Sequence, residues 1–393
     1  MNRNYQATMT ACFIGYIVQA IVNNFAPLLF LTFQTSYQIP LTQITLLVTV
    51  NFGIQLLIDL LSAFFVDKIG YRACMIVAHV CSATGLVALT LLPEVLPSAF
   101  LGILLSVCIY AVGGGLIEVL VSPIMESCPT DNKETAMSLL HSFYCWGQVG
   151  VVLISTLFFH FFGIAQWKLL AVLWAVIPVC NAIVFTKVPL AALIGDDEPQ
   201  MSVRTLMTKN IFWTLMLIML CAGASEQTIS QWASTFVESG LGISKTVGDL
   251  LGPMTFALLM GCSRAYYGKY GSRINLNHFM RVSGMLCLMA YLCIALIPSP
   301  VFGLAGLALC GLSVGILWPG TFSRATVLKN SGTALFALLA LAGDFGCFAG
   351  PTLAGFISGH FHDNLKVGIL VSALFPLALL LGLSILSRQT KSD

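Results

Sequence analysis

Residues 62–72 read Ser-Ala-Phe-Phe-Val-Asp-Lys-Ile-Gly-Tyr-Arg, and residues 263–273 read Ser-Arg-Ala-Tyr-Tyr-Gly-Lys-Tyr-Gly-Ser-Arg. Ser, Lys, Gly and Arg occupy the same places in both stretches, at a constant offset of 201 residues. A second echo, at an offset of 196, pairs residues 146–150 (Trp-Gly-Gln-Val-Gly) with residues 342–346 (Ala-Gly-Asp-Phe-Gly). These echoes predict two copies of one structural unit that follow each other along the chain.

The composition indicates that a lipid bilayer surrounds this chain. It has 393 residues, of which 58% are hydrophobic and only 9% are charged, whereas a soluble domain carries about 25% charged residues. A single soluble core stops growing near ~250–300 residues and does not absorb so much apolar sequence. The 13 cysteines show no CxxC pair or metal-type spacing, which is typical of small hydrophobes in a membrane. No basic run indicates a nucleic-acid partner.

Twelve stretches have the ~20 mostly apolar residues that a membrane-crossing helix needs. The longest polar connector follows the sixth of them. We therefore expect an all-α membrane protein with an N-terminal six-helix bundle (1–187), a cytoplasmic connector (188–209) and a C-terminal six-helix bundle (210–393). The expected spans are 7–31, 42–66, 71–92, 98–125, 134–161, 166–187, 210–237, 246–268, 275–297, 300–324, 332–358 and 364–387.

The positions of lysine and arginine predict the orientation in the membrane. With the N-terminus in the cytoplasm, 15 of the 18 Lys and Arg residues fall on the cytoplasmic side and 3 fall outside, in agreement with the positive-inside rule. The N-terminal stretch has no small-residue cleavage pattern after a short apolar core, so we expect it to remain as the first helix. The prediction is a multi-pass protein of the cell membrane, a bacterial inner membrane, with both termini cytoplasmic.

The first of the repeated segments resembles a family motif. Ala63-x-x-x-Asp67-Lys-x-Gly70-Tyr-Arg72 is similar to the loop motif Gly-x-x-x-Asp-Arg/Lys-x-Gly-x-Arg/Lys of the major facilitator superfamily, with Ala in place of the first Gly. A small residue there permits close helix approach, Asp67 is suited to capping a helix or pairing with a cation, and Gly70 turns the chain. The resemblance implies alternating access in a protein of two parallel six-helix repeats, with the solute held near the midplane between them.

Further stretches resemble the fucose/glucose-galactose permease branch of that superfamily. Residues 113–123 (Gly-Gly-Gly-Leu-Ile-Glu-Val-Leu-Val-Ser-Pro) contain Glu118 and resemble its Gly-rich fourth helix, and His141 precedes an aromatic-Gly turn as on its fifth helix. Asn23-Asn24 and Trp318-Pro319 resemble its first and tenth helices. The resemblance implies sugar as the solute and coupling to protons.

One departure from the branch concerns this coupling. In the fucose permease an Asp follows three positions after the second Asn and helps to couple proton and sugar. Pro27 holds that position here, and Ser122 replaces the Asn of the branch's Asn-Pro. Glu118 is therefore the one member of that acid pair that carries over, and the sequence leaves open whether transport is coupled at all.

Four acidic residues stand inside apolar spans: Asp59, Glu118, Glu226 and Asp344. A carboxylate at that depth costs about 3 kcal/mol on insertion scales and usually marks a substrate or ion pathway. Glu118 and His141 lie on helices joined by a short loop, and at about 1.5 Å per residue their depths match, so we expect them to be close. Glu118 serves either as the proton-coupling group or as a protonated helix contact.

Asp344 aligns with Gln148 in the repeat, and both stand in the middle of the fifth helix of their half. We expect the two side chains to face a shared cavity. No Lys or Arg stands clearly at that depth, so the sequence predicts no ion pair for Asp344. It is protonated, bound to Na⁺ or hydrogen-bonded to the solute, and it is the expected second ion-coupling residue beside Glu118. Trp318 either packs on the solute or fills a helix interface.

Amide side chains and an aromatic ring are expected on the first helix of each half. Gln227 and Gln231 are four residues apart and share a helix face, with Trp232 beside Gln231. Asn23 and Asn24 form the matching cluster on the first span. Amides bond hydroxyl groups and rings pack on C–H faces, so the set suits a polyhydroxylated solute; the alternative for each residue is a hydrogen bond between helices, worth about 0.6 kcal/mol.

The leading prediction is a secondary active transporter of a small polar solute, with a sugar and H⁺ coupling favoured. The alternatives are an exporter or importer of another polar metabolite, Na⁺-coupled or uniport, and a solute sensor that does not transport. No HExxH, GxSxG or phosphate-binding Gly-rich loop with Lys occurs, so no enzyme, cofactor, metal or nucleotide is expected. The expected partners are the solute, the ion and the bilayer, and the protein is predicted to be a monomer.

Overall fold

The computed structural model describes residues 5–129, 133–190, 203–270, 273–325, 328 and 332–392. Within these residues every regular element is a helix. The chain forms two compact units, Met1–Gly195 and Asp196–Asp393. The boundary falls inside the segment 188–209, and residues 191–202 of that segment lie outside the described part.

The predicted membrane spans are confirmed. Among the residues that the structure describes, twelve helical segments are long and apolar enough to cross a membrane, six in each unit, so the chain is an all-α membrane protein. In the first unit the helices are α1 (Gln6–Asn24), α2 (Phe30–Tyr37), α3 (Leu41–Ile69), α4 (Tyr71–Val95), α5 (Ala99–Ser127), α6 (Lys133–Phe162) and α7 (Trp167–Lys187). In the second they are α8 (Val203–Met207), α9 (Asn210–Thr235), α10 (Lys245–Asp249), α11 (Thr255–Tyr270), α12 (Leu276–Leu296), α13 (Pro300–Val314), α14 (Leu317–Ala325), α15 (Gly332–His360), α16 (Leu365–Ser372) and α17 (Leu374–Ser392).

Several spans are built from two helical pieces, and proline explains the clearest break. The first span passes from α1 through a 3₁₀ turn, Ala26–Leu29, into α2. Pro27 stands in that turn and has no N–H to continue the α-helical ladder. Pro253 likewise stands in a π-helical turn, Leu250–Met254, between α10 and α11. Hydropathy predicts the spans but not these interruptions, because a proline changes backbone hydrogen bonding without changing apolar character.

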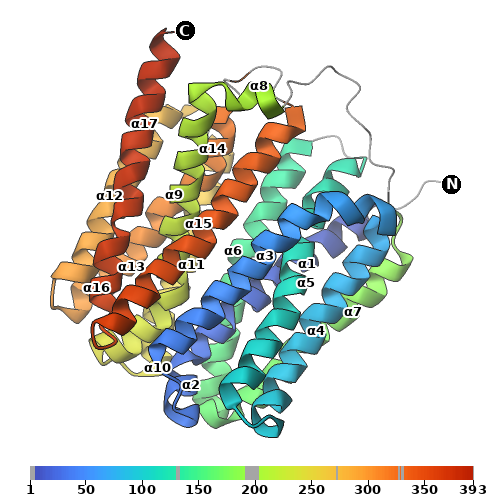
Figure 1. Ribbon diagram of the computed structural model, residues 1–393, viewed down its shortest axis with the longest axis vertical. Helices are drawn as coiled ribbons and strands as arrows, with labels where there is room; N and C mark the ends of the chain where they lie inside the picture. Colours follow the sequence, from blue (N-terminus) through green and yellow to red (C-terminus); the bar gives the residue numbers. More distant parts are fainter. Residues whose placement is uncertain are drawn as a thin grey trace. The chain divides into compact units, whose positions relative to one another are not determined.

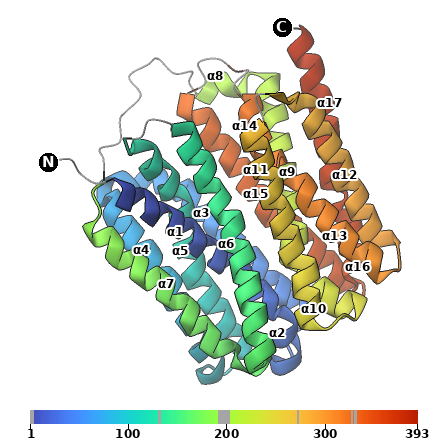
Figure 2. The same ribbon diagram turned by 180° about the vertical axis from the view of Figure 1, so that it is seen from behind.

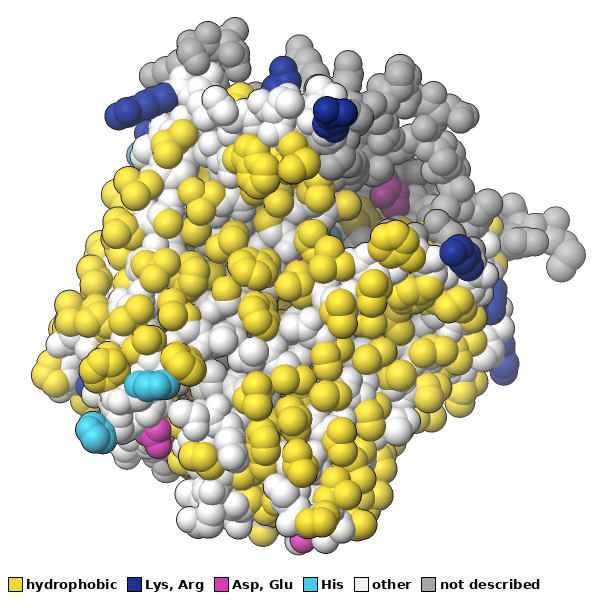
Figure 3. Space-filling model, viewed as in Figure 1, with side chains coloured by type: hydrophobic (Ala, Val, Ile, Leu, Met, Phe, Trp, Pro, Cys, Tyr) yellow, Lys and Arg dark blue, Asp and Glu magenta, His cyan; other side chains and the backbone are white. Residues whose placement is uncertain are grey.

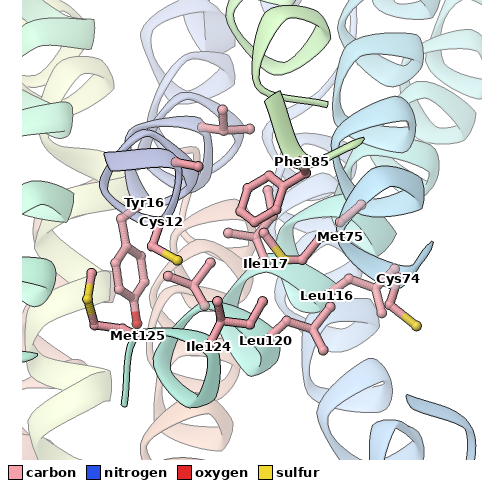
Figure 4. Packing of buried hydrophobic residues seen from close by; sticks show 14 of the residues in the cluster. Cys12, Tyr16, Cys74, Met75, Leu116, Ile117, Leu120, Ile124, Met125 and Phe185 are labelled. Carbon is pink, nitrogen blue, oxygen red and sulfur yellow. The ribbon is translucent and has the colours of Figure 1, made fainter. Parts of the chain in front are cut away.

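In the first unit α4 runs between α5 and α7, and α1 packs on α5, α6 and α7 (Figures 1 and 2). The interior of this unit is an apolar cluster to which α1, α4, α5 and α7 contribute, seen from close by in Figure 4. Its members include Cys12, Met75, Ile117 and Phe185, each with at most 2% of its surface exposed. Two of the cysteines in the cluster, Cys12 and Cys74, pack as small hydrophobes in the way that the sequence predicts.

The outer surface of the helices is apolar. Leucine, valine, isoleucine and phenylalanine side chains are exposed along almost every span, for example Leu57, Phe64, Val80 and Leu173. Figure 3 shows apolar side chains over most of the face in view, with few charged ones among them. Exposed apolar area on this scale fits lipid rather than water, because monomeric soluble proteins rarely expose contiguous apolar patches beyond a few hundred Å².

Three successive glycines allow three helices to approach α5. A methyl group at Gly113 would meet the backbone of Ala78 and the hydroxyl of Ser82 on α4. At Gly114 it would lie 3.1 Å from Val22 Cγ1 on α1, and at Gly115 it would lie 3.0 Å from Gln55 Cα on α3. Small residues permit such close contact between membrane helices. The run of glycines therefore places α1, α3 and α4 directly around the segment that carries Glu118.

The loop motif also has a structural explanation. Gly70 lies between α3 and α4 with φ of +93°, a conformation that L side chains rarely adopt. The Arg72 guanidinium donates to the backbone carbonyl oxygens of Phe185 at 2.5 Å and Val188 at 2.7 Å. These carbonyl groups lie at the C-terminal end of α7, so Arg72 caps that helix. Its positive charge also interacts favourably with the negative end of the helix dipole. The side chain of Asp67, which the sequence also assigns to this motif, lies outside the described part.

Glycines also allow α9 and α15 of the second unit to pack closely. We expect a larger residue at such a position to lower the stability of this unit. A methyl group at Gly346 would meet the Leu220 carbonyl oxygen and, at 2.8 Å, the Ala224 backbone nitrogen on α9. We expect Gly346→Ala to cost about 1–3 kcal/mol of stability, as other overpacked interiors do. Thermal unfolding of the purified protein in detergent measures this effect.

Gly150 is the matched control, because it is the repeat equivalent of Gly346 and nothing lies within 4 Å of an added methyl group there. Gly150→Ala is expected to be neutral or to stabilise α6 by about 0.5–1 kcal/mol, since alanine loses less backbone entropy on folding. Equal melting temperatures for Gly346→Ala and Gly150→Ala would contradict the packing explanation.

Candidate functional site

Four buried amide side chains form a hydrogen-bonded chain in the first unit, with Glu118 at one end. Gln19 Nε2 on α1 donates to Glu118 Oε2 on α5 at 3.0 Å and to Gln55 Oε1 on α3 at 3.1 Å. Gln55 Nε2 donates to Asn23 Oδ1 at 2.8 Å, and Asn51 Nδ2 donates to the same oxygen at 3.2 Å. The four amide residues are at most 6% exposed. A carboxylate inside an apolar span is thus linked to polar groups on two other helices.

The spacing of residues on two helices produces this chain. Gln19 and Asn23 are four residues apart on α1, and Asn51 and Gln55 are four apart on α3, so each pair shares one helix face. Gly114 provides the space between them: a methyl group there would lie 3.2 Å from Gln19 Oε1 and 3.3 Å from Gln55 Cδ. Together, the two spacings and the glycine bring the amides of α1 and α3 into contact with α5.

His141 on α6 is connected to α5, the helix that carries Glu118, by contacts through Tyr16. The Tyr16 ring on α1 stands 5.5 Å from the His141 ring on α6, centroid to centroid. The Tyr16 hydroxyl is 3.2 Å from Ser122 Oγ, one turn after Glu118 on α5. His141 itself is exposed. The structure therefore connects His141 to α5 through Tyr16 and Ser122.

The remaining predicted residues of the first unit lie on the same helices. Asn24 Nδ2 donates to the Ala20 carbonyl oxygen at 2.9 Å and is 3.5 Å from the Tyr144 hydroxyl on α6. Gln148 is a turn further along α6 and is 2% exposed. Asn24 faces α6 through Tyr144, whereas its neighbour Asn23 belongs to the amide chain on the side of α3.

In the second unit Gln227 and Gln231 contact each other, while Trp232 packs into the interior. Gln231 Nε2 donates to Gln227 Oε1 at 3.3 Å. The Trp232 ring is fully buried, and its Nε1–H donates to the Pro351 carbonyl oxygen on α15 at 2.9 Å. Trp232 therefore holds α9 against α15. Gln227 and Gln231 form a pair of amide side chains on the same helix.

Glu226 forms an ion pair that the sequence does not predict. Arg264 Nη2 on α11 lies 2.9 Å from Glu226 Oε2 on α9, with side-chain exposures of 15% and 8%. Arg264 lies within the span Lys245–Tyr270, as it does in the expected span 246–268, and its long side chain reaches the carboxylate.

In the second unit the Trp318 ring lies against Gly343, the residue that precedes Asp344. Asp344 is half-buried on α15. A methyl group on its neighbour Gly343 would collide with the Trp318 ring of α14, so the indole lies against the backbone of α15 at that point. Phe322 continues this aromatic contact, with ring centroids 6.3 Å apart. The glycine that precedes Asp344 thus allows the close approach of Trp318.

Sequence reasoning missed Gln55 and Asn51, although a signal was present. Asn51, Gln55 and Asp59 follow one another at intervals of four residues on α3 and make a polar stripe on an otherwise apolar helix. Asp59 stands out in this stripe because it is charged, whereas the uncharged Asn51 and Gln55 do not. Within the described residues no group of three or more His, Cys, Asp or Glu side chains is arranged to hold a metal ion.

Comparison with known proteins places this arrangement in a family. The model of the Major Facilitator Superfamily matches residues 10–351, and curated protein sequences gave no significant match. Among solved structures, a bacterial homologue of the human lysosomal transporter Spinster, inward-facing and occupied, aligns with a TM-score of 0.79 at 14% identity over 99% of this chain and 98% of its own.

Two further solved structures share the fold. The fucose:proton symporter FucP of E. coli aligns with a TM-score of 0.65 at 16% identity over 98% of this chain and 99% of its own. The nucleoside transporter NupG aligns with a TM-score of 0.70 at 12% identity over 97% and 99%. Since the family match spans well over half of the residues, this chain belongs to the Major Facilitator Superfamily and is a membrane transporter, not an enzyme.

Proposed function

We propose that this transporter moves a small, hydroxyl-rich polar solute, a sugar, by alternating access together with H⁺, and that Glu118 carries the proton. The observation behind this proposal is the contact between the Glu118 carboxylate and the Gln19 amide at 3.0 Å. It joins the ionisable group of an apolar span to a chain of amides. Amides bond hydroxyl groups through both donor and acceptor atoms, which suits a sugar better than an apolar solute.

Two further observations support the same class of solute. The second unit has its own amide pair, Gln227 and Gln231, on the first long helix after the connector. The fold is shared with a fucose:proton symporter. In our proposal Asn23, Asn24, His141 and Gln148 from the first unit, and Gln227, Gln231, Trp318 and Asp344 from the second, contribute to solute binding.

A ligand screen followed by transport tests the proposed function. Purified protein is heated with millimolar monosaccharides, polyols, nucleosides and organic acids in turn, because a ligand stabilises the folded state by RT ln(1 + [L]/Kd). The stabilising compound, radiolabelled, is then offered to proteoliposomes with and without an imposed pH gradient. Uptake of a sugar that rises with the gradient is expected. Stabilisation by organic acids alone, or uptake indifferent to the gradient, would contradict the proposal.

The amide pair of the second unit is expected to contribute directly to affinity. Gln231→Ala leaves a polar partner unpaired and should weaken binding of the identified solute by about 1–3 kcal/mol. Isothermal titration measures the change in Kd, and Gln166→Ala, at an exposed position of the first unit, is the control. Wild-type affinity in both Gln231→Ala and Gln227→Ala would show that this pair serves helix packing only.

Asp344 is expected to be the second group on which ion dependence rests. Glu226 is held as a charged partner of Arg264, whereas Asp344 stands in the middle of α15 and aligns in the repeat with the polar Gln148. Asp344→Asn should therefore shift the pH or Na⁺ dependence of uptake, and Asp59→Asn should shift it less. A wild-type profile in Asp344→Asn, together with an altered one in Glu226→Gln, would reverse this ranking.

A further inference from the structure

Each end of the amide chain carries a buried amide oxygen that has no hydrogen-bond donor among the described residues. These oxygens are Gln19 Oε1 and Asn51 Oδ1. Gln19 is 2% exposed and Asn51 is 6% exposed. A buried polar atom without a partner destabilises the folded state, and in a folded protein it calls for an explanation. The pattern of the other hydrogen bonds supplies one.

Every hydrogen bond between two of the four amides can also form with donor and acceptor exchanged. If each amide turns by half a rotation, its NH₂ and oxygen exchange places with little change in shape. Gln55 then donates to Gln19, and Asn23 donates to Gln55 and to Asn51. The same contacts persist, with donors and acceptors exchanged. In this reversed chain Asn51 Oδ1 gains the donor that it now lacks.

The state of Glu118 decides between the two senses. An ionised carboxylate only accepts hydrogen bonds, so it requires Gln19 to present its NH₂, as observed at 3.0 Å. A proton taken up from water onto Glu118 Oε2, the oxygen that faces Gln19, turns that atom into an O–H donor, and this donor takes Gln19 Oε1 as its acceptor. Gln19 must then rotate, and Gln55, Asn23 and Asn51 follow, because otherwise two NH₂ groups or two oxygens would face each other.

We propose that the protonation state of Glu118 sets the orientation of the amides of Gln19, Gln55, Asn23 and Asn51 as one unit. With Glu118 ionised, the ends of the chain offer oxygens and take hydroxyl donors of the solute. With Glu118 protonated, the ends offer N–H groups and take its acceptor oxygens. The inference rests on the proposed function in that Glu118 carries the proton, and it adds how the solute senses that proton.

Other titratable groups surround α5 and must be separated from Glu118 in any test. The Tyr16 hydroxyl is 3.2 Å from Ser122 Oγ, one turn after Glu118 on α5, and the His141 ring lies tilted against the Tyr16 ring. The charged or titratable residues of the helices packed on α5 are Cys12 and Tyr16 on α1, Asp59 and Lys68 on α3, Tyr71, Arg72, Cys74, His79, Cys81 and Glu94 on α4, and His141, Tyr144, Cys145 and His160 on α6. The side chains of Asp67 on α3 and of Lys133 and Glu134 on α6 lie outside the described residues.

Infrared difference spectroscopy tests the relay without any solute. Protein with ¹³C in the glutamine side-chain carbonyls is reconstituted in lipid, and spectra are recorded across a pH titration. The wild type should show a protonated-carboxyl band together with a shift of the labelled amide bands. Glu118→Gln should lose both. Gln19→Leu should keep the carboxyl band and lose the amide shift, and Gln43→Leu, at the start of α3 and outside the chain, should resemble the wild type.

Each outcome bears on the relay separately from transport. An amide shift that persists in Gln19→Leu, or a Glu118 carboxyl band with no amide shift in the wild type, would overturn the relay even if Glu118 couples transport. If Gln19→Leu does not fold, Gln55→Met interrupts the chain one link further, and protein with ¹³C in the asparagine side-chain carbonyls should then lose the asparagine amide shift that the wild type shows. Absence of a Glu118 carboxyl band, by contrast, would refute the proposed proton carrier itself.

Discussion

Glu118→Gln is expected to abolish accumulation of the solute against its gradient while leaving exchange. Gln keeps the size and hydrogen-bonding capacity of the side chain, so Gln19 at 3.0 Å retains a partner, but an amide does not exchange a proton in this pH range. The internal solute concentration should then fall to that outside, and counterflow of labelled against unlabelled solute should continue.

Proteoliposome uptake under an imposed pH gradient measures this effect, with counterflow in the same vesicles as the control for folding. Asp59→Asn is a matched control, because it removes an acid from the neighbouring helix α3 rather than from α5. If Glu118→Gln still concentrates the solute, coupling lies elsewhere in the chain. Loss of both accumulation and counterflow would instead show that Glu118 is needed for binding.

Arg264→Met is expected to be the most destabilising single change in the second unit. It leaves the Glu226 carboxylate, whose side chain is 8% exposed, without its cation. Removing one partner of a buried ion pair costs about 3–5 kcal/mol, and the 15% exposure of Arg264 favours the lower end of that range. Thermal unfolding in detergent should show a large drop in melting temperature.

A double variant separates the cost of an unpaired charge from the loss of packing. Glu226→Gln combined with Arg264→Met removes both charges, and replacing a buried pair by uncharged residues is often neutral. The double variant should therefore recover most of the stability lost in Arg264→Met. If the double variant is as unstable as the single one, the Arg264 side chain contributes through its apolar stem and not through its charge.

The candidate site was predictable in its acids and in part of its amides. Glu118, Asn23 and Gln231 stand out because a polar residue in an apolar span is costly and therefore visible in the sequence. Gln55 and Asn51 were missed, since nothing in a hydropathy pattern says that their face of α3 meets Gln19 and Asn23. Trp232 is predicted beside the solute, and the structure adds a contact that the sequence does not show, from its N–H to the Pro351 carbonyl oxygen.

The sequence by itself determined the number of spans, the repeat and the positions of the intramembrane acids. Length and apolar content are sufficient for that, because a helix in lipid satisfies its own backbone and needs only to be long and apolar enough. Only the tertiary structure decided which polar side chains meet. Contacts such as Glu118 with Gln19 and Glu226 with Arg264 depend on how closely helices cross. That distance is set by packing at single residues such as Gly114, where a methyl group would already crowd the Gln19 amide.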